Sequence, residues 1–129
     1  MDTPLRVLLV EDSETDARLA TIALRRAGYA PESERVEDAA ALGAALDRDG
    51  WDVVLTQWSG ASLGAIEVLA AVKRLRPEVP VIVISGTPGE DIAVDAMRAG
   101  AADFVLKHKL ARLSVAVDRE LRGGRDDGG

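Results

Sequence analysis

The stretch Val81-Ile82-Val83-Ile84-Ser85-Gly86-Thr87 is the clearest structural element of the sequence. Its four consecutive β-branched residues, without polar alternation, are typical of a strand that is covered on both faces. Arg6-Val7-Leu8-Leu9-Val10 has the same character, and Val53-Val54-Leu55 continues it inside the run 51–56. Strands of this kind belong to parallel sheets that carry helices on both sides. These runs therefore predict an α/β fold.

Helical segments separate the apolar runs. Ser13 is predicted to cap a helix that runs to Ala27, and Ser62 is predicted to cap a helix that ends at Arg76. Strands that alternate with helices form a parallel sheet, because each crossover is right-handed. We therefore predict a doubly wound, five-stranded parallel sheet of the flavodoxin-like (βα)5 kind, with the charged second strand at its edge. The predicted strands are residues 6–10, 30–36, 51–56, 80–85 and 103–106, and the predicted helices are residues 13–27, 38–49, 62–76, 90–98 and 111–122.

The bulk composition narrows the class of protein. A length of 129 residues predicts one domain, here residues 1–122, and the glycine- and aspartate-rich residues 123–129 are predicted to be a disordered tail. The absence of cysteine excludes disulfides, thiolate metal sites and thiol nucleophiles. A net charge of −6 argues against a nucleic-acid-binding surface. No apolar run approaches the length of a membrane span and the N-terminus has no signal-peptide core, so we expect a cytoplasmic protein without membrane partners.

Polar residues follow four of the predicted strands. Glu11 and Asp12 follow the first strand, Gln57 the third, Ser85-Gly86 the fourth and Lys107-His108 the fifth. Ligands of open parallel sheets bind at the carboxyl ends of the strands. We therefore expect these residues to gather at one edge of the sheet.

The chemistry of such an edge follows from its charges. Two adjacent carboxylates suit Mg²⁺, which prefers oxygen ligands. A lysine ammonium and a serine hydroxyl can each hold a phosphoryl oxygen. An aspartate could form an acyl phosphate at such a site, whereas the glutamine amide at residue 57 is uncharged and a very poor nucleophile.

Together with Ala99-Gly100-Ala101-Ala102-Asp103-Phe104-Val105-Leu106-Lys107, these residues resemble the receiver domain of two-component response regulators. The resemblance covers about residues 5–122. It implies that Glu11 and Asp12 are the acidic pair that holds Mg²⁺, and that Gln57 stands where the phosphoacceptor aspartate belongs. It further implies a phosphate pocket of Ser85, Gly86 and Lys107, with Ser85 and Phe104 as the switch residues.

Three departures from the family pattern accompany the resemblance. The first is Gln57 itself. The second is the loop after it, where Ala61 and Ala65 stand in place of a proline and a glycine. The third is His108, which follows the lysine in place of a proline and matters less, because ordinary receivers also vary there.

Several interpretations of the pocket stay open at this point. Glu11-Asp12 is also compatible with a charge pair at a helix N-terminus, where the helix dipole favours acidic residues. Without a third carboxylate we expect Mg²⁺ binding to be weakened, although Gln57 offers an amide oxygen as a metal ligand. A direct salt bridge between Lys107 and Asp12, with no metal, is the alternative. A plain core position is the other interpretation of Phe104.

The function predicted from these residues is that of an atypical receiver domain in two-component signal transduction. We expect it to act as a protein-interaction module without aspartyl phosphorylation or enzymatic activity, with a histidine kinase or an output protein as partner. The resemblance places the partner face on residues 87–99 and 108–122. The alternative is an ordinary phosphorylatable receiver that bears an engineered substitution at position 57, against which Ala61 and Ala65 count. A flavodoxin-like cofactor binder is disfavoured, because Glu11 and Asp12 would repel the cofactor phosphate.

Overall fold

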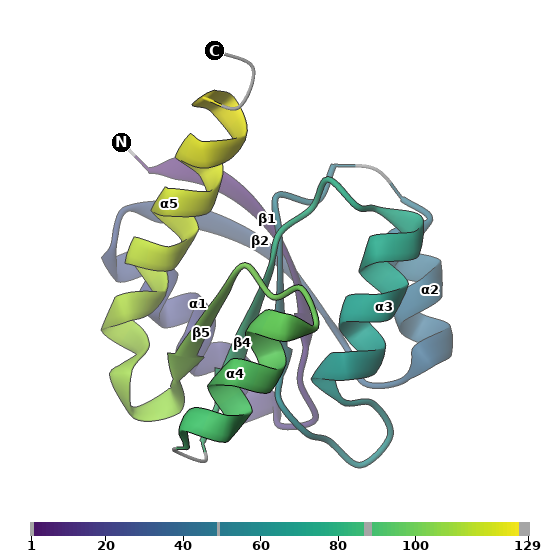
Figure 1. Cartoon of the computed structure of the whole chain (residues 1–129). Helices are drawn as coiled ribbons and strands as arrows, with labels where there is room; N and C mark the ends of the chain where they lie inside the picture. The colour runs from purple at the N-terminus through teal and green to yellow at the C-terminus, as the bar shows by residue number, and fades with distance from the viewer. Residues whose placement is uncertain (1, 49, 87–88, 127–129) are drawn as a thin grey trace.

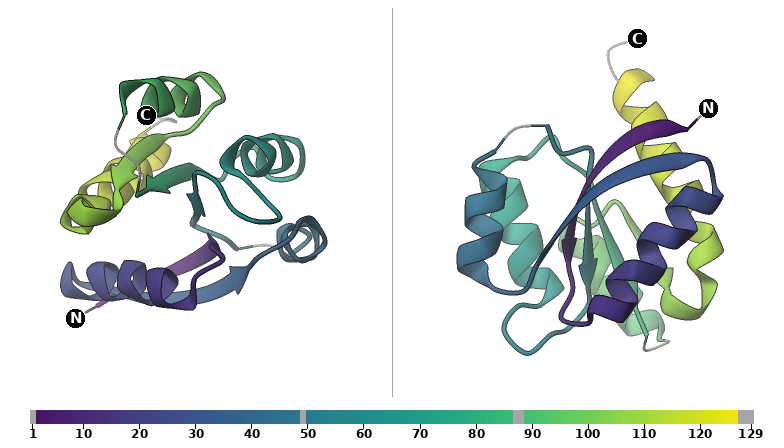
Figure 2. Two further views of the ribbon diagram at one scale, coloured as in Figure 1. Left: turned by 90° about the horizontal axis from the view of Figure 1, so that it is seen from below. Right: turned by 180° about the vertical axis from the view of Figure 1, so that it is seen from behind.

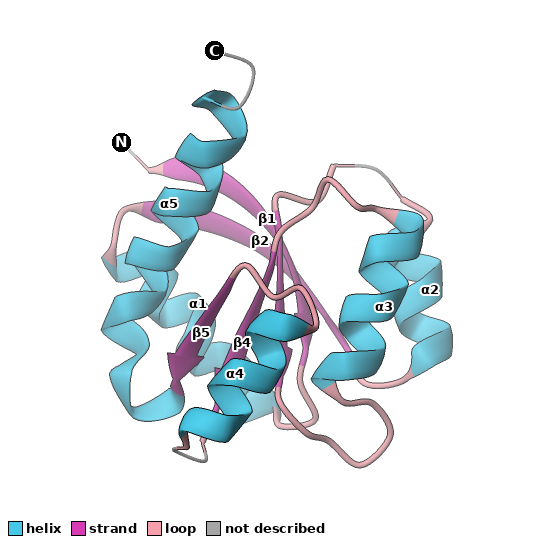
Figure 3. Ribbon diagram, in the orientation of Figure 1, coloured by secondary structure: helices cyan, strands magenta, loops and turns pink. Residues whose placement is uncertain are grey.

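The five predicted strands form a single parallel sheet in the computed structural model, which describes residues 2–48, 50–86 and 89–126. The strand order is β2-β1-β3-β4-β5, so the predicted doubly wound architecture is confirmed (Figures 1 and 3). The strands are β1 (Thr3–Val10), β2 (Tyr29–Val36), β3 (Val53–Gln57), β4 (Val81–Ser85) and β5 (Asp103–Leu106). The helices are α1 (Glu14–Arg26), α2 (Ala39–Leu46), α3 (Ala65–Leu75), α4 (Glu90–Arg98), the 3-10 helix η1 (Lys107–Arg112) and α5 (Leu113–Asp126).

Each face of the sheet carries its own hydrophobic core. Strand side chains alternate between the faces, so Val7 and Leu9 of β1 pack in the cluster that contains α1 and α5. Leu8 and Val10 pack in the cluster that contains α2, α3 and α4. Figure 2 shows the two sets of helices on opposite sides of the sheet. Residues 7–10 of β1 and all residues of β3 and β4 are buried, as their unbroken apolar character predicts.

The start of α1 follows the prediction and the start of α3 does not. Ser13 caps α1, where its Oγ accepts a hydrogen bond from the N–H of Asp16 at 3.1 Å. Gly64, not Ser62, occupies the capping position of α3. The segment between Gln57 and Ala65 turns back on itself, because the N–H of Ala65 donates to the carbonyl of Trp58 at 2.9 Å. Residues that the sequence pattern assigns to a first helical turn therefore form a loop beside the end of β3.

Other boundaries also differ from the predicted ones. Helix α2 ends at Leu46, short of the predicted residue 49, which lies outside the described part of the chain. Helix α5 extends to Asp126, beyond the predicted domain boundary at residue 122. The predicted disordered tail therefore overlaps the end of α5, and residues 127–129 lie outside the described residues. The helix η1, which begins at Lys107, was not predicted as a separate element.

Strand β2 lies at the edge of the sheet, as its charges predict. It pairs along its whole length with β1, and Pro31 stands opposite Leu5 in the register. Its side chains include Glu32, Glu34 and Arg35. Within residues 2–48, 50–86 and 89–126, no helix is long and apolar enough to cross a membrane.

Candidate functional site

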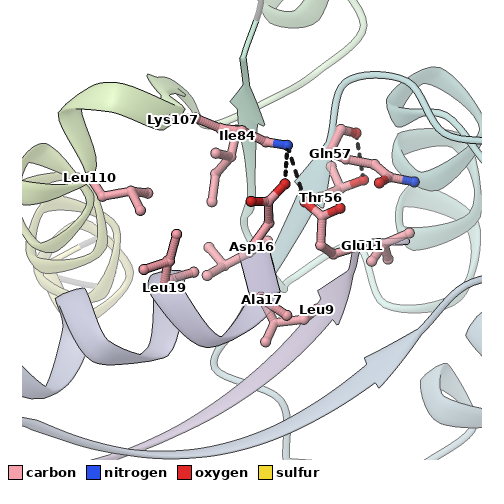
Figure 4. A pocket seen from close by; sticks show the side chains of 13 residues that line it. Leu9, Glu11, Asp16, Ala17, Leu19, Thr56, Gln57, Ile84, Lys107 and Leu110 are labelled. Carbon is pink, nitrogen blue, oxygen red and sulfur yellow. Dashed lines mark hydrogen bonds and ion pairs between the residues drawn. The ribbon is translucent and has the colours of Figure 1, made fainter. Parts of the chain in front are cut away.

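The strand order brings the predicted site residues to one edge of the sheet. β1, β3, β4 and β5 are neighbours in this order and all are parallel, so their carboxyl ends lie side by side. Glu11, Gln57 and Lys107, from three of these strand ends, line one cavity of about 40 Å³ together with residues of α1 (Figure 4). The prediction that these strand ends form a common site is confirmed for these residues.

Gln57 is the last residue of β3, and both polar atoms of its side-chain amide form hydrogen bonds. Its side chain is buried, with an exposed fraction of 5%. Oε1 accepts a hydrogen bond from the N–H of Asp12 at 2.9 Å, and Nε2 donates to the carbonyl of Leu63 at 3.2 Å. The first bond connects β3 to the acidic residues after β1, and the second connects it to the loop before α3. A carboxylate in the same place could accept the first bond and could not donate the second.

Asp12 faces the loop that follows β3. Its Oδ2 accepts a hydrogen bond from the N–H of Ala61 at 2.7 Å. Gly60 lies so close that a Cβ atom there would be 2.8 Å from Oδ2 of Asp12 and 1.8 Å from Nε2 of Gln57. The loop thus closes over Asp12 and Gln57, and its closure depends on a residue without a side chain at position 60.

Lys107 pairs with carboxylates other than the predicted one. Its Nζ lies 2.5 Å from Oδ2 of Asp16 and 3.8 Å from Oε1 of Glu11 (Figure 4). The alternative of a direct salt bridge between Lys107 and Asp12 is therefore wrong, because Asp12 accepts from the Ala61 N–H and Asp16 supplies the closer carboxylate. Burial lowers the pKa of the Lys107 ammonium, while the hydrogen bond to Asp16 and the charge of Glu11 raise it, with a net rise above the ordinary value of 10.5.

Sequence reasoning missed Asp16. This residue stands in the first turn of α1, where acidic side chains are favoured by the helix dipole whatever their partners. Its spacing of four residues from Asp12 is the available signal, although Asp12 itself precedes the N-cap Ser13. That spacing is too common at helix starts to single out a partner for a lysine 91 residues away along the chain.

Glu11 is fixed by backbone contacts as well as by the lysine. Its carboxylate is nearly buried and its Oε2 accepts from the N–H of Ser13 at 3.0 Å. From β2, Nη1 of Arg35 donates to the main-chain carbonyl of Glu11 at 3.1 Å and also binds Glu37. The acidic pair is thus part of a structured turn at the start of α1, and its role as a metal-binding pair stays a prediction.

Ser85 and Gly86 lie at the end of β4, next to the lysine. Ser85 is buried, with an exposed fraction of 3%. A Cβ atom at Gly86 would be 3.3 Å from Cδ of Lys107, so the lysine stem passes directly over this glycine. Thr87, which completes the sequence motif, lies outside the described residues. The structure thus places Gly86 beside Lys107, while a phosphate-binding role for Ser85, Gly86 and Lys107 stays a prediction.

Phe104 and His108 lie away from this cavity. Phe104 is partly buried against the core on the α2, α3 and α4 side and lines a hollow between α4 and α5. His108 is exposed on η1. The contacts of Phe104 are those of a core residue, and its predicted switch role stays untested.

The comparison with protein families shows to which family the chain belongs. A family described as "Response regulator receiver domain" matches residues 7–118. The chain belongs to this family. The receiver family thus covers every strand end that contributes to the site, from Glu11 to Lys107.

Individual receivers and regulators are similar over nearly the whole chain. Nitrogen assimilation regulatory protein NtrX of Azorhizobium caulinodans is 36% identical over 117 residues, which are 89% of this chain and 26% of that protein. Sensory transduction protein RegX3 of Mycobacterium bovis is 36% identical over 123 residues, 94% of this chain and 53% of that protein. The chain therefore spans about a quarter to a half of the length of these relatives.

Solved structures support the receiver fold. The crystal structure of NtrX from Brucella abortus aligns with a TM-score of 0.81 at 29% identity, over 98% of this chain and 28% of that chain. A response regulator receiver domain protein from Clostridium thermocellum aligns with a TM-score of 0.80 at 22% identity, over 94% and 97% of the two chains. The second likeness shows the fold alone.

The predicted metal ligands of this receiver already accept hydrogen bonds from the main chain. Three backbone N–H groups donate hydrogen bonds to these side chains, one each to an oxygen of Glu11, Asp12 and Gln57. Over the described ranges, no group of three or more acidic, histidine or cysteine side chains is placed to hold a metal ion. Mg²⁺ binding by Glu11, Asp12 and Gln57 stays a prediction.

Proposed function

We propose that this chain is a receiver domain that acts as a protein-interaction module without aspartyl phosphorylation at residue 57. The observation that carries the proposal is the amide of Gln57 at the end of β3, bound to Asp12 on one side and to Leu63 on the other. Formation of an acyl phosphate requires a carboxylate oxygen that attacks phosphorus while the leaving group of the donor departs. An amide with both of its polar atoms engaged has neither the charge nor the freedom for this step.

The other hydroxyl and carboxyl groups of the pocket support the same proposal. Thr56 is buried and donates its hydroxyl hydrogen to the carbonyl of Gln57 at 2.9 Å. Glu11 and Asp16 hold Lys107, and Asp12 accepts from Ala61. A phosphoryl group on Glu11 or Asp16 would compete with the ion pairs to Lys107, and one on Oδ2 of Asp12 would displace the N–H of Ala61. We therefore expect no substitute acceptor among them.

The test is incubation of the purified protein with acetyl phosphate and Mg²⁺, followed by intact-mass spectrometry and a phosphate-affinity gel. The wild-type chain is expected to remain unmodified. The matched variant Gln57→Asp restores a carboxylate at the end of β3 and shows whether the rest of the pocket still supports the reaction. A stoichiometric phosphoprotein from the wild-type chain, with the phosphoryl group mapped to any pocket residue, would refute the proposal.

We place the partner-binding surface on α4 and α5, following the resemblance to receivers. Three large apolar side chains of these helices are exposed: Val94 and Met97 of α4, and Val115 of α5, with exposed fractions of 45%, 49% and 61%. Helix α4 also has a single buried side chain, Ala96, among its residues. We propose that these three side chains form one contiguous apolar patch, since such a patch in solvent is typical of a binding surface. The partner would be a histidine kinase or an output protein.

The surface assignment can be tested against a candidate partner by titration calorimetry. Met97→Glu and Val115→Glu introduce charge on α4 and α5 and are expected to lower the affinity at least tenfold. Ile66→Glu is the matched control, because Ile66 is equally exposed, at 51%, and lies on α3. Equal losses for all three variants would place the surface elsewhere.

A further inference from the structure

We infer that Gln57 fastens the loop between β3 and α3, residues 58–64, in one conformation through the donor and the acceptor of its side-chain amide. The inference rests on the proposed function, because it assigns residue 57 to holding this loop and not to accepting a phosphoryl group. It gives the glutamine a structural role that a carboxylate at the same position could not fill. Gln57 is in this sense a positioning residue, whose effect on the pocket runs through the loop.

The first observation is that the two hydrogen bonds of the amide have opposite directions. Oε1 of Gln57 accepts from the N–H of Asp12 at 2.9 Å, and Nε2 donates to the carbonyl of Leu63 at 3.2 Å. A backbone N–H can only donate and a carbonyl can only accept, so these partners require one acceptor and one donor on the side chain between them. Glutamine has both, whereas an ionised glutamate of the same length has acceptors alone. The site is therefore matched to an amide.

The second observation is that these bonds form part of a closed circuit between the end of β1 and the loop. Asp12 donates its N–H to Gln57, which donates in turn to Leu63. The circuit is completed by the N–H of Ala61, which donates to Oδ2 of Asp12 at 2.7 Å. The loop is thus attached at Ala61 and at Leu63. Loss of the Gln57 amide would remove the second attachment and free the main chain of Asp12, on which the first depends.

The third observation is that burial contributes little to the order of the loop. Residues 59–62 are exposed, and Leu63 is the first side chain after them to enter the core, with an exposed fraction of 2%. Segments with few buried apolar contacts open locally at a low cost in free energy. The conformation of residues 59–62 therefore depends on hydrogen bonds more than on packing. Without the amide, we expect the loop to open while the sheet stays folded.

Hydrogen exchange of the native protein, followed by ¹⁵N–¹H NMR with no phosphodonor present, tests the inference at single groups. In the wild type, the N–H of Ala61 and the side-chain Nε2 protons of Gln57 should exchange about tenfold more slowly, or slower still, than the same groups in an unfolded chain. The reference is the N–H of Thr3, which donates to the carbonyl of Gly28 at 2.9 Å at the opposite end of the sheet. Unprotected Nε2 protons would overturn the inference without the need for any variant.

Two variants of Gln57 remove the fastening in different ways. Gln57→Glu keeps the length and the acceptor of the side chain and loses the donor to Leu63, whereas Gln57→Met loses both bonds without adding a charge. In each variant the N–H of Ala61 should exchange about tenfold faster than in the wild type, or faster still, while the N–H of Thr3 keeps its rate. Ser62→Ala is the matched control, because it shortens an exposed side chain of the same loop and leaves the three bonds in place. This control should exchange like the wild type.

Two results of the variant experiment would contradict the inference. One is an unchanged exchange rate of Ala61 in both variants. The other is acceleration of Ala61 and Thr3 by the same factor, which would mean a loss of global stability and no separate fastening of the loop. If neither variant folds, the protection of the Nε2 protons in the wild type decides the question. Because these measurements contain no phosphodonor, a phosphorylated wild-type chain would refute the proposed function and leave the exchange rates unaffected.

Discussion

A Cβ atom at Gly60 would lie 1.8 Å from Nε2 of Gln57, so position 60 accepts no side chain while Gln57 keeps its conformation. This contact links the residue that replaces the expected carboxylate to the loop that closes over it. The same Cβ would also approach Asp12, at 2.8 Å from Oδ2. The Gln57 amide, the Asp12 carboxylate and the Gly60 backbone are thus one packed unit.

The variant Gly60→Ala should therefore destabilise the protein. The methyl group would expel the Gln57 amide from its place and break its bonds to Asp12 and Leu63, and a buried polar group left unsatisfied costs about 1–3 kcal/mol. Urea unfolding measures the change. Gly43→Ala is the control, because Gly43 lies inside α2 and a Cβ there would have no neighbour within 4 Å apart from the adjacent residues and the backbone of its own helix. This control should gain about 0.5–1 kcal/mol, and a neutral Gly60→Ala would contradict the packing described.

Gln57→Asp should lower the free energy of unfolding at neutral pH. The new carboxylate would be buried near Glu11 and Asp12 and would lack the donor that now binds Leu63. Desolvation and like charges raise the folded-state pKa of such a group above the unfolded value of about 3.9. The penalty is then complete above the folded pKa and disappears as the pH falls toward the unfolded pKa.

Urea unfolding over a series of pH values measures this effect. The difference between Gln57→Asp and the wild type should shrink on acidification. Gln57→Asn, which shortens the side chain and keeps the amide, should show a difference that stays constant with pH. A constant difference for both variants would mean that the position does not disfavour charge.

Lys107 should contribute a stability that is lost at alkaline pH. Its pKa is raised in the folded state, since the bond to Asp16 and the charge of Glu11 outweigh burial, which acts in the opposite direction. A raised pKa means that the contribution is complete below the unfolded value, ordinarily 10.5, and is lost as the pH rises through the folded value. At neutral pH, Lys107→Met should therefore have a lower free energy of unfolding than the wild type. This difference should decrease as the pH rises above the unfolded-state pKa of Lys107. Denaturant unfolding at increasing pH checks this, with Lys109→Met as the charge-matched control; parallel curves for both variants would refute it.

Tyr29→Phe should destabilise the end of the sheet opposite the site. The Tyr29 hydroxyl donates to Oδ1 of Asp118 and so connects the start of β2 to α5. Tyr29 is buried, and a hydrogen bond to a charged acceptor contributes about 1.5–3 kcal/mol. Thermal unfolding should show a lower melting temperature, and Asp118→Asn should cost less because it keeps an acceptor oxygen. A larger loss for Asp118→Asn would point to a different role of the carboxylate.

The central strands could be predicted because their residue types are apolar throughout, which indicates burial on both faces. The runs that end at Val10, Thr56 and Ser85 are apolar on both faces, and such runs form the centre of a parallel sheet. The strand order then fixes which chain segments meet, so the common site of Glu11, Gln57 and Lys107 also followed from the sequence. The start of α3 was harder to predict. Ser62 has a side chain that can cap a helix, but the hydrogen bonds of the 57–65 loop leave Gly64 at the capping position.

The pairing of charges inside the site was not predictable. Asp12 and Asp16 both lie close to the pocket in the sequence. Which of the two pairs with Lys107 depends on which carboxylate accepts the hydrogen bond from the Ala61 N–H. That contact in turn depends on the path of a loop whose sequence carries no strong turn signal beyond Gly60 and Gly64. Side-chain partners separated by most of the chain are decided by three-dimensional packing and not by local pattern.

The edge strand has a consequence for how this protein can assemble. β2 is eight residues long, and a flat edge of that length would invite another chain to extend the sheet. Pro31 removes one main-chain donor from that border, and Glu32, Glu34 and Arg35 surround it with charge. Sheet-to-sheet polymerisation is thereby discouraged even when the protein is concentrated. Complexes of this receiver should therefore be built from helix surfaces, which can dissociate without any strand being peeled away.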